Sequence, residues 1–325
     1  MSGQSDIEWT DATWNPVTGC SHVSEGCKNC YAETFAGRGM GPWKGRAFTD
    51  VRCHPERLDW PLRKRKPMRV FVNSMSDLFH DDVPDTFIES VFGVMATAGH
   101  HTFQVLTKRP ERMAKWFAGR SHGLCVAEMC GKVELRSPGG RRDRFENMPP
   151  GWPWPLKNVW LGVSVENQRT ADERIPLLLQ TPAAVRFLSC EPLLGPVDLT
   201  DLPVPDKERD YRFNCLTDMD DEHVYNAHKK VDWVIVGGES GHRARPCDTQ
   251  WILNLICQGK AAGIPMFIKQ LGSQWARCYG FKRSEGGNTK GGDPLEWPTG
   301  LRVREFPENS GKEKSSTPPP SSVKA

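Results

Sequence analysis

The sequence predicts an α/β fold built as a partial or complete parallel (β/α) barrel. Short apolar runs alternate with amphipathic helical stretches between about residues 69 and 270, and this rhythm is typical of βα units. About seven strands of this kind would approach a full or partial barrel. The same pattern also allows an open doubly wound sheet, which is the alternative architecture.

The first two βα units are the most regular. Residues 69–73 (RVFVN) form a buried-strand pattern, and residues 85–98 follow with apolar side chains at helical spacing. Residues 102–107 (TFQVLT) repeat the strand pattern. Pro110 comes next, and proline suits the first turn of a helix.

Further units follow along the chain. Four more strands are expected, at residues 159–165, 185–188, 233–236 and 265–268. Helices are expected at about residues 168–180 and 249–262. A further strand near the first cysteines would bring the number to about seven, which is close to a full or partial barrel.

We expect one domain over residues 1–305, interrupted by two insertions. The first insertion, at about residues 119–157, is rich in Gly, Pro and Arg. The second, at about residues 195–230, is rich in Asp. Both interrupt the βα pattern as long loops, which often select substrates. Residues 306–325 are too polar and too rich in Pro and Ser to bury a core, so we expect a disordered tail.

The composition excludes several classes of protein. The 325 residues are 38% hydrophobic and 26% charged, and no apolar run approaches the roughly 20 residues that span a bilayer. The first residues, MSGQSDIEWTD, lack a basic segment followed by an apolar one, so we expect a cytoplasmic protein without membrane contact. The net charge of +3 does not by itself indicate nucleic-acid binding, although residues 63–69 form a basic cluster.

Three cysteines near the N-terminus indicate a metal centre. Cys20, Cys27 and Cys30 have the spacing C-x6-C-x2-C within a chain of 11 cysteines. Structural zinc sites usually have four protein ligands, whereas a four-iron four-sulfur cluster on three cysteines leaves one iron open. The zinc alternative remains, with His22 or Cys53 as the fourth ligand.

The remaining cysteines carry weaker indications. Cys190, Cys247, Cys257 and Cys278 fit small buried hydrophobic positions. Cys190 also lies at a strand end beside Glu191, where a thiol could give a hydrogen atom to a substrate radical. A separate metal site from His122, Cys125 and Cys130 in the first insertion is conceivable, but such a trio in a variable loop is more often incidental.

Every expected strand ends in polar or charged residues. If the strands are parallel, these ends surround one mouth of the barrel, where ligands bind in such folds. The strand ends are 73–77 (NSMSD), 107–109 (TKR), 164–167 (SVEN), 189–191 (SCE), 237–240 (GGES) and 269–270 (KQ). Glu239 follows Gly237 and Gly238, which would allow a ligand to approach the backbone closely; a tight turn is an equal alternative.

The cysteine loop and the βα units together resemble the radical S-adenosylmethionine superfamily. In that superfamily three cysteines, usually spaced C-x3-C-x2-C, hold a four-iron four-sulfur cluster whose open iron binds the cofactor's amino and carboxylate groups. This chain keeps C-x2-C followed by the aromatic Tyr31, and has six residues in place of three before it.

A closer resemblance is to the phage and prophage proteins known as gene products thirty-seven and sixty-eight, described by a three-cysteine motif. The similar segments cover most of residues 7–272 outside the insertions, and they are 9–16 (WTDATWNP), 19–20 (GC), 27–33 (CKNCYAE), 73–79 (NSMSDLF), 105–112 (VLTKRPER), 161–167 (LGVSVEN), 188–194 (LSCEPLL) and 234–241 (VIVGGESG).

The resemblance implies a radical enzyme. The cluster would reduce S-adenosylmethionine, and the resulting 5′-deoxyadenosyl radical would take a hydrogen atom from the substrate. Residues after the second strand often contact the cofactor's amino group, and by position these would be Ser74, Ser76 and Asp77. The further candidate contacts to cofactor or substrate are Glu166, Gly237, Gly238 and Glu239, and the candidate catalytic residues are Lys108, Cys190 and Glu191.

The resemblance also suggests partners. Nucleic acid or a nucleotide is the first substrate class expected, and a small metabolite or a peptide is the alternative. An electron donor is required, and a partner protein named for the three-cysteine motif often accompanies the family. The non-enzyme alternative is a zinc-stabilised nucleic-acid-binding module.

Overall fold

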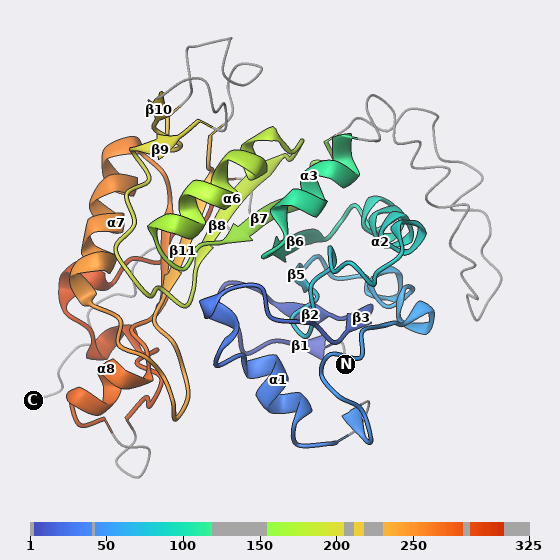
Figure 1. The fold of residues 1–325 in the computed structure, drawn as a ribbon, viewed down its shortest axis with the longest axis horizontal. Coiled ribbons are helices and arrows are strands. Elements are labelled where there is room, and N and C mark those ends of the chain that lie inside the picture. The colour runs from blue at the N-terminus through green and yellow to red at the C-terminus, as the bar shows by residue number, and fades with distance from the viewer. Residues whose placement is uncertain are drawn as a thin grey trace, which may run out of the picture.

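The computed structural model describes residues 3–40, 43–118, 155–204, 211–217, 230–281 and 287–308. They form a mixed α/β fold around one 8-stranded sheet that curls into a half-barrel (Figure 1). The possible metal site in the first insertion and the tail beyond residue 308 lie outside the described residues.

Seven of the sheet's eight strands are parallel. The first strand, β1 (Gly3–Gln4), pairs antiparallel with β2. The strands from β2 onward pair in parallel with their neighbours; they are β2 (Ala12–Trp14), β5 (Arg69–Val72), β6 (Thr102–Thr107), β7 (Val159–Ser164), β8 (Val185–Cys190), β11 (Trp233–Gly237) and β12 (Met266–Gln270). The expected strands are therefore confirmed, and β2, just before the cysteine loop, is the additional one.

The order of the strands distinguishes the two expected architectures. Neighbouring strands follow the chain, as β1-β2-β5-β6-β7-β8-β11-β12. A doubly wound sheet reverses this order at a switch point, and this sheet does not. The partial barrel is confirmed, with β1 and β12 at its two edges.

The helices cover one face of the sheet. Residues of α2, α3, α6 and α7 share a hydrophobic core with alternate strand residues. The helices are α1 (Tyr31–Ala36), α2 (Asp85–Thr97), α3 (Pro110–Ala118), α6 (Gln168–Gln180), α7 (Thr249–Ala262) and α8 (Ser273–Cys278). Two short antiparallel strand pairs lie outside the main sheet, β3 (Val17–Thr18) with β4 (Arg52–Cys53) and β9 (Leu202–Pro203) with β10 (Arg212–Phe213).

The inner face of the half-barrel is packed with aromatic side chains. Trp233 lies at the centre, with Trp160 at 5.8 Å and Phe267 at 6.1 Å between ring centroids. Gly162 on β7 leaves room for Phe187, because a Cβ there would come within 2.6 Å of its ring. Tilted aromatic rings of this kind pack favourably against one another, so an aromatic cluster fills the half-barrel beneath its mouth.

The segment after β12 packs against this inner face. The ring of Phe306 lies 5.4 Å from Trp233 and 4.3 Å from the guanidinium carbon of Arg69. The carbonyl of Glu305 accepts a hydrogen bond of 2.9 Å from Trp233 Nε1. Phe306, the first residue of the expected tail, is thus part of the fold. Within the described ranges, no helix is long and apolar enough to cross a membrane.

Replacing Phe306 with Ala should destabilise the half-barrel, because it removes an aromatic contact between β11, β12 and β5. We expect a loss of about 2 kcal/mol in the free energy of unfolding, measured by urea denaturation. Phe306→Leu keeps most of the apolar volume and should lose less. Equal stability of wild type and Phe306→Ala would show that the segment does not hold the sheet.

Candidate functional site

A cavity of about 390 Å³ lies at the carboxyl ends of the parallel strands. Each of six strand ends contributes at least one lining residue, and these include Asn73, Thr107, Ser164, Ser189, Glu239 and Gln270. The expected ring of polar strand ends is therefore confirmed. The volume suits a small-molecule ligand.

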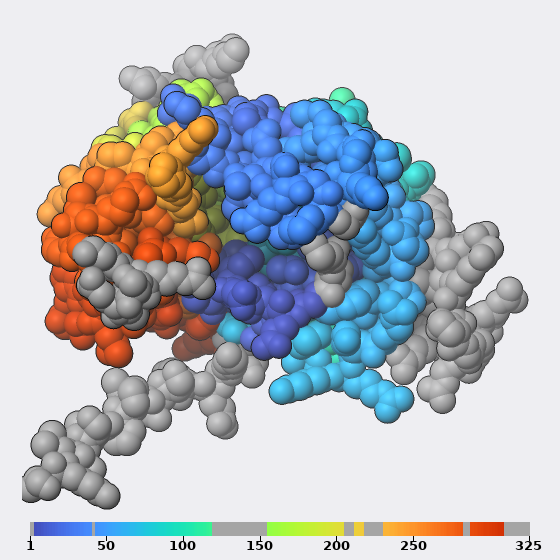
Figure 2. All heavy atoms as spheres, turned by 90° about the horizontal axis from the view of Figure 1, so that it is seen from below, coloured from blue at the N-terminus to red at the C-terminus, as the bar shows by residue number. Residues whose placement is uncertain are grey.

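The cavity reaches the open edges of the half-barrel. Ile7 and Glu8, before β2, line one side, and Lys269 of β12 lines another. Figure 2 shows the molecule hollowed between the blue N-terminal segments and the orange segments of the chain. The floor includes apolar side chains of the inner face, among them Trp9 and Phe71.

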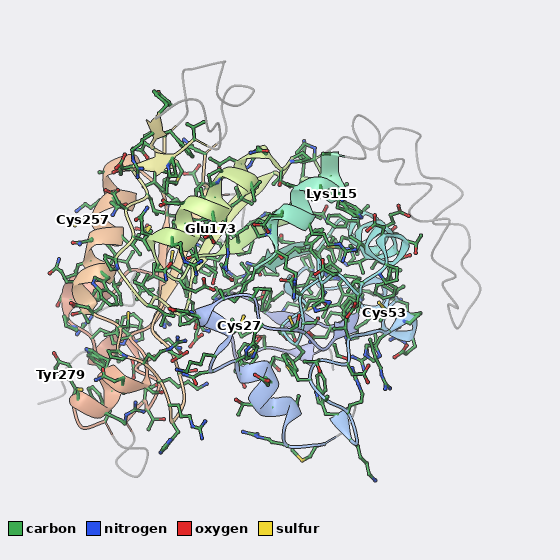
Figure 3. The ribbon with its side chains drawn as sticks, in the orientation of Figure 1. Cys27, Cys53, Lys115, Glu173, Cys257 and Tyr279 are labelled. Carbon is green, nitrogen blue, oxygen red and sulfur yellow. The ribbon has the colours of Figure 1, made fainter. Side chains whose placement is uncertain are left out.

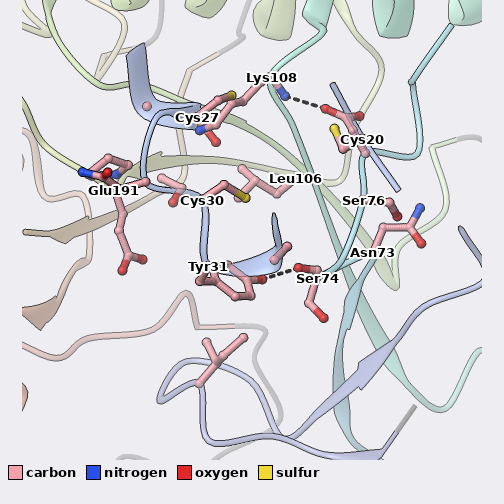
Figure 4. A pocket seen from close by; sticks show the side chains of 18 of the residues that line it. Cys20, Cys27, Cys30, Tyr31, Asn73, Ser74, Ser76, Leu106, Lys108 and Glu191 are labelled. Atoms are coloured by element: carbon pink, nitrogen blue, oxygen red, sulfur yellow. Dashed lines mark hydrogen bonds between the residues drawn. The ribbon is translucent and has the colours of Figure 1, made fainter. Parts of the chain in front are cut away.

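All three cysteines of the motif line this cavity. Cys20, Cys27 and Cys30 carry free thiols, and Figure 4 shows them around one part of the cavity. The pKa of Cys20 is raised to about 12, mainly by burial and in addition by the neighbouring charges of Asp77 and Cys27. Burial also raises the pKa of Cys30. Since metal ligands must be thiolates, metal binding here would release protons.

The described residues do not assemble a site for a single metal ion, either from the three thiols alone or with a fourth ligand. Among the described residues, no group of three or more His, Cys, Asp or Glu is arranged to hold a single metal ion. His22 lines the cavity, but its Nε2 lies 2.7 Å from a carboxylate oxygen of Glu33. Cys53 packs against the hydrophobic core from β4, and Figure 3 shows it well apart from Cys27.

Glu166 holds the cysteine loop from beneath. Its carboxylate is 1% exposed and lies 3.0 Å from Lys108 Nζ and 3.1 Å from Arg174 Nη1. The hydroxyl of Ser24 donates to Glu166 Oε1 at 2.8 Å. A Cβ on Gly26 would overlap this carboxylate, so only glycine allows the loop to pack this closely against Glu166. Glu166 therefore contacts the loop, and it is not among the residues lining the cavity.

Two cationic neighbours stabilise the ionised form of Glu166. Burial by itself would raise the pKa of a carboxyl in this position. Lys108 and Arg174 act in the opposite direction and prevail, so the pKa of Glu166 is lowered from its ordinary value.

Glu239 anchors the other side of the same loop. Arg245 pairs with it through Nη2 at 2.6 Å and Nε at 3.0 Å. Asn29 Nδ2, within the cysteine motif, donates to Glu239 Oε2 at 2.9 Å and to the carbonyl of Arg243 at 3.0 Å. Glu239 lines the cavity as expected, but most of its hydrogen-bonding capacity is used by the protein itself.

The serines after β5 are also bonded within the chain. Ser74 exchanges hydrogen bonds with the side chain of Asn15, and its carbonyl accepts a hydrogen bond from the Tyr31 hydroxyl (Figure 4). The Ser76 hydroxyl donates to the carbonyl of Val17 at 2.9 Å. Both residues line the cavity, yet their hydroxyls stabilise the cysteine loop and its approach.

Asp77 organises the turn after β6. Its carboxylate accepts hydrogen bonds from the Thr107 hydroxyl at 2.8 Å and from the backbone N–H groups of Lys108 and Phe79, each at 2.9 Å. It is 6% exposed. Asp77 therefore lines the cavity mainly as a structural carboxylate.

Asn73 is a lining residue that the sequence did not single out. Its φ of 63° is left-handed, a conformation that Asn adopts more readily than most residues. Its Oδ1 accepts from the N–H of Val17 at 3.2 Å, whereas its buried Nδ2 has no partner among the described residues. Unpaired buried donors are costly, so a bound ligand is a reasonable partner. The only sequence sign was an Asn directly after a buried strand.

Glu191 and Lys269 form an ion pair on the cavity wall. Lys269 Nζ lies 2.7 Å from Glu191 Oε1, and both side chains are 18% exposed. Gln270 Nε2 donates to the same oxygen at 3.3 Å. Gly237 lies between the two strands that carry the pair, and a Cβ there would come within 3.3 Å of Glu191. This pair is accessible to a ligand.

The other two strand-end predictions have internal roles. A Cβ on Gly238 would overlap the carbonyl of Leu271, so this glycine serves the packing of the chain. Cys190 is fully buried on the helix-covered face with Leu188, and burial raises its pKa to about 12. Neither Cys190 nor Gly237 nor Gly238 is among the lining residues.

Comparison with known proteins identifies the family. The model of the DUF5131 family, described as a protein of unknown function, matches residues 4–299. The chain belongs to the DUF5131 family. No curated protein and no solved structure matches it. The matched span of this DUF5131 protein contains the cysteine loop and every strand of the half-barrel except the first residue of β1.

Glu166→Gln should destabilise the protein strongly, because it leaves Lys108 and Arg174 without a counter-charge. We expect a loss of about 3 kcal/mol in the free energy of unfolding at neutral pH, measured in urea. The pKa of Glu166 is lowered from 4.5 in the folded state, so its contribution is present above that pH and is lost as the pH falls further. The difference between wild type and variant should therefore shrink in acid.

Glu173→Gln on α6 is the matched control. Glu173 forms an exposed ion pair with Arg169, and such pairs contribute about 0.5 kcal/mol or less. If Glu166→Gln and Glu173→Gln proved equally stable, Glu166 would not be the anchor of the loop.

Proposed function

We propose that this DUF5131 protein is a radical S-adenosylmethionine-like iron–sulfur enzyme with its cluster on Cys20, Cys27 and Cys30. The observation that carries the proposal is the position of the three free thiols on a loop that is fixed over the mouth of a parallel half-barrel. Ligands bind at this end of parallel α/β folds.

The donor set fits the proposed group. Three thiols are available around a cavity with room for a small-molecule cofactor. With its cofactor, a reduced cluster of this kind supplies one-electron cleavage of a sulfonium bond and so a means of removing a hydrogen atom from a substrate.

The protein's residues would bind, orient and shield the reactants. Glu166 and Glu239 fix the loop, so the thiols are positioned before the cofactor arrives. Glu191 and Lys269 present a carboxylate and an ammonium group to the cavity, and these can orient polar groups of cofactor or substrate. The apolar floor with Trp9 and Phe71 excludes water from the reacting atoms.

For the substrate we propose a nucleotide or nucleic acid. Four basic side chains line the cavity, and they are Lys108, Arg109, Lys269 and Lys290. Three of them form ion pairs, which leaves Lys290 as the lining cation best placed to bind a phosphate. The basic residues 63–66 precede β5 and therefore lie at the opposite end of the strands from the cavity. A separate electron donor and a partner protein belong to the same proposal.

Anaerobic reconstitution with iron and sulfide tests the proposal. We expect uptake of about four iron atoms per chain, a visible charge-transfer absorption, and release of 5′-deoxyadenosine with S-adenosylmethionine and a reductant. Cys20→Ser, Cys27→Ser and Cys30→Ser should each lose most of the iron. Cys257→Ser is the control, because Cys257 is an exposed free thiol on α7 far from Cys27 (Figure 3).

The possible outcomes separate the function classes. Bound zinc without iron uptake would contradict the proposal and favour the structural zinc module. A cluster without 5′-deoxyadenosine release would contradict the radical enzyme but leave an iron–sulfur protein. Equal iron loss in Cys257→Ser and the three loop variants would show that the loop cysteines are not the ligands.

A further inference from the structure

Ser21 lies directly after the first cysteine of the motif and lines the cavity. Two side chains approach its hydroxyl. Arg109 Nη2 lies 2.7 Å from Ser21 Oγ, and His80 Nε2 lies 2.8 Å from it. The direction of these two hydrogen bonds determines where the proton of Ser21 can point.

The backbone settles the tautomer of His80. The N–H of Asp82 donates to His80 Nδ1 at 3.1 Å, so Nδ1 is the acceptor nitrogen of the ring. In a neutral imidazole the other nitrogen then carries the proton. His80 Nε2 therefore donates to Ser21 Oγ.

Arg109 can only donate, because a guanidinium has no acceptor atom. Ser21 Oγ thus accepts two hydrogen bonds, and a hydroxyl oxygen has two lone pairs. Its own proton must point away from both His80 and Arg109. The described residues provide no acceptor for that proton, so the Ser21 hydroxyl is a fixed donor on the wall of the cavity, beside Cys20.

We propose that the Ser21 hydroxyl donates a hydrogen bond to a sulfide of the cluster. This inference rests on the proposed function. Hydrogen bonds to the sulfur atoms help to set the reduction potential of a cluster. A donor that is oriented by His80 and carries the field of Arg109 stabilises the extra negative charge of the reduced state. Ser21 is therefore a positioning residue that raises the potential.

The matched pair Ser21→Thr and Ser21→Val tests this role, because the two side chains have nearly the same shape and only Thr has the donor. The reconstituted proteins are titrated with dithionite against redox dyes, and the one-electron reduction is followed by visible absorption and electron paramagnetic resonance. A hydrogen bond to a charged group corresponds to about a tenfold effect. We expect the equilibrium constant for reduction to fall about tenfold in Ser21→Val, which is about 59 mV, and to stay near wild type in Ser21→Thr.

Thr34→Val is a second control in the same region. The hydroxyl of Thr34 is already committed to the carbonyl of Cys30, at 3.0 Å, so its loss should leave the potential unchanged. If Ser21→Val does not load iron, Ser21→Ala replaces it and is held to the same expectation.

Two results would overturn the inference in different ways. A normal iron content in Ser21→Val with a wild-type potential would refute the role of Ser21 and leave the proposed function intact. No iron uptake by the wild-type protein would refute the proposed function, and the role of Ser21 with it.

Discussion

The cysteine loop is held over the half-barrel by two carboxylates at the ends of β7 and β11, the strands on either side of β8, and the site depends on this constraint. Glu166 follows β7 and bonds Ser24, whereas Glu239 follows β11 and bonds Asn29. The loop is therefore tied on both sides of Cys27. Buried carboxylates cost desolvation energy unless cations and hydrogen bonds offset it; here Arg174 and Arg245 supply those charges.

Because of these anchors, several strand-end residues have a structural role in place of the expected ligand-binding role. A ring of polar groups around a barrel mouth indicates ligand binding, and the ring is present. Much of it nevertheless binds the protein's own loop. Asp77, Glu166 and Glu239 are satisfied by internal donors. Capacity for a ligand lies instead with other lining groups, among them the Glu191–Lys269 pair and Asn73. A bound ligand would therefore meet a site whose loop is already positioned.

The sequence predicted the strands and their end residues well, because buried parallel strands leave a clear apolar pattern and their ends must share one edge. It could not assign partners to those ends. Ser24 and Glu166 are 142 residues apart, and Asn29 and Glu239 are 210 apart. Nothing in the sequence distinguished Gly26, next to Cys27, from other glycines, and only the structure shows that it packs against Glu166. The alternation on β8 likewise turns Cys190 toward the helices and Ser189 toward the cavity.

The inner core and the mouth of the half-barrel differ in how the chain bounds them. At the inner core, Phe306 and Glu305 connect the last strand to Trp233 and Arg69. At the mouth, the cavity is lined by both edges of the sheet, from Glu8 on one side to Lys269 on the other. The outer edge of β12 is itself paired with the segment that follows it, because the N–H of Ile268 donates to the carbonyl of Val303 and the N–H of Glu305 donates to the carbonyl of Met266. The cavity therefore opens at the mouth, where the fixed loop determines how closely a ligand can approach the three thiols.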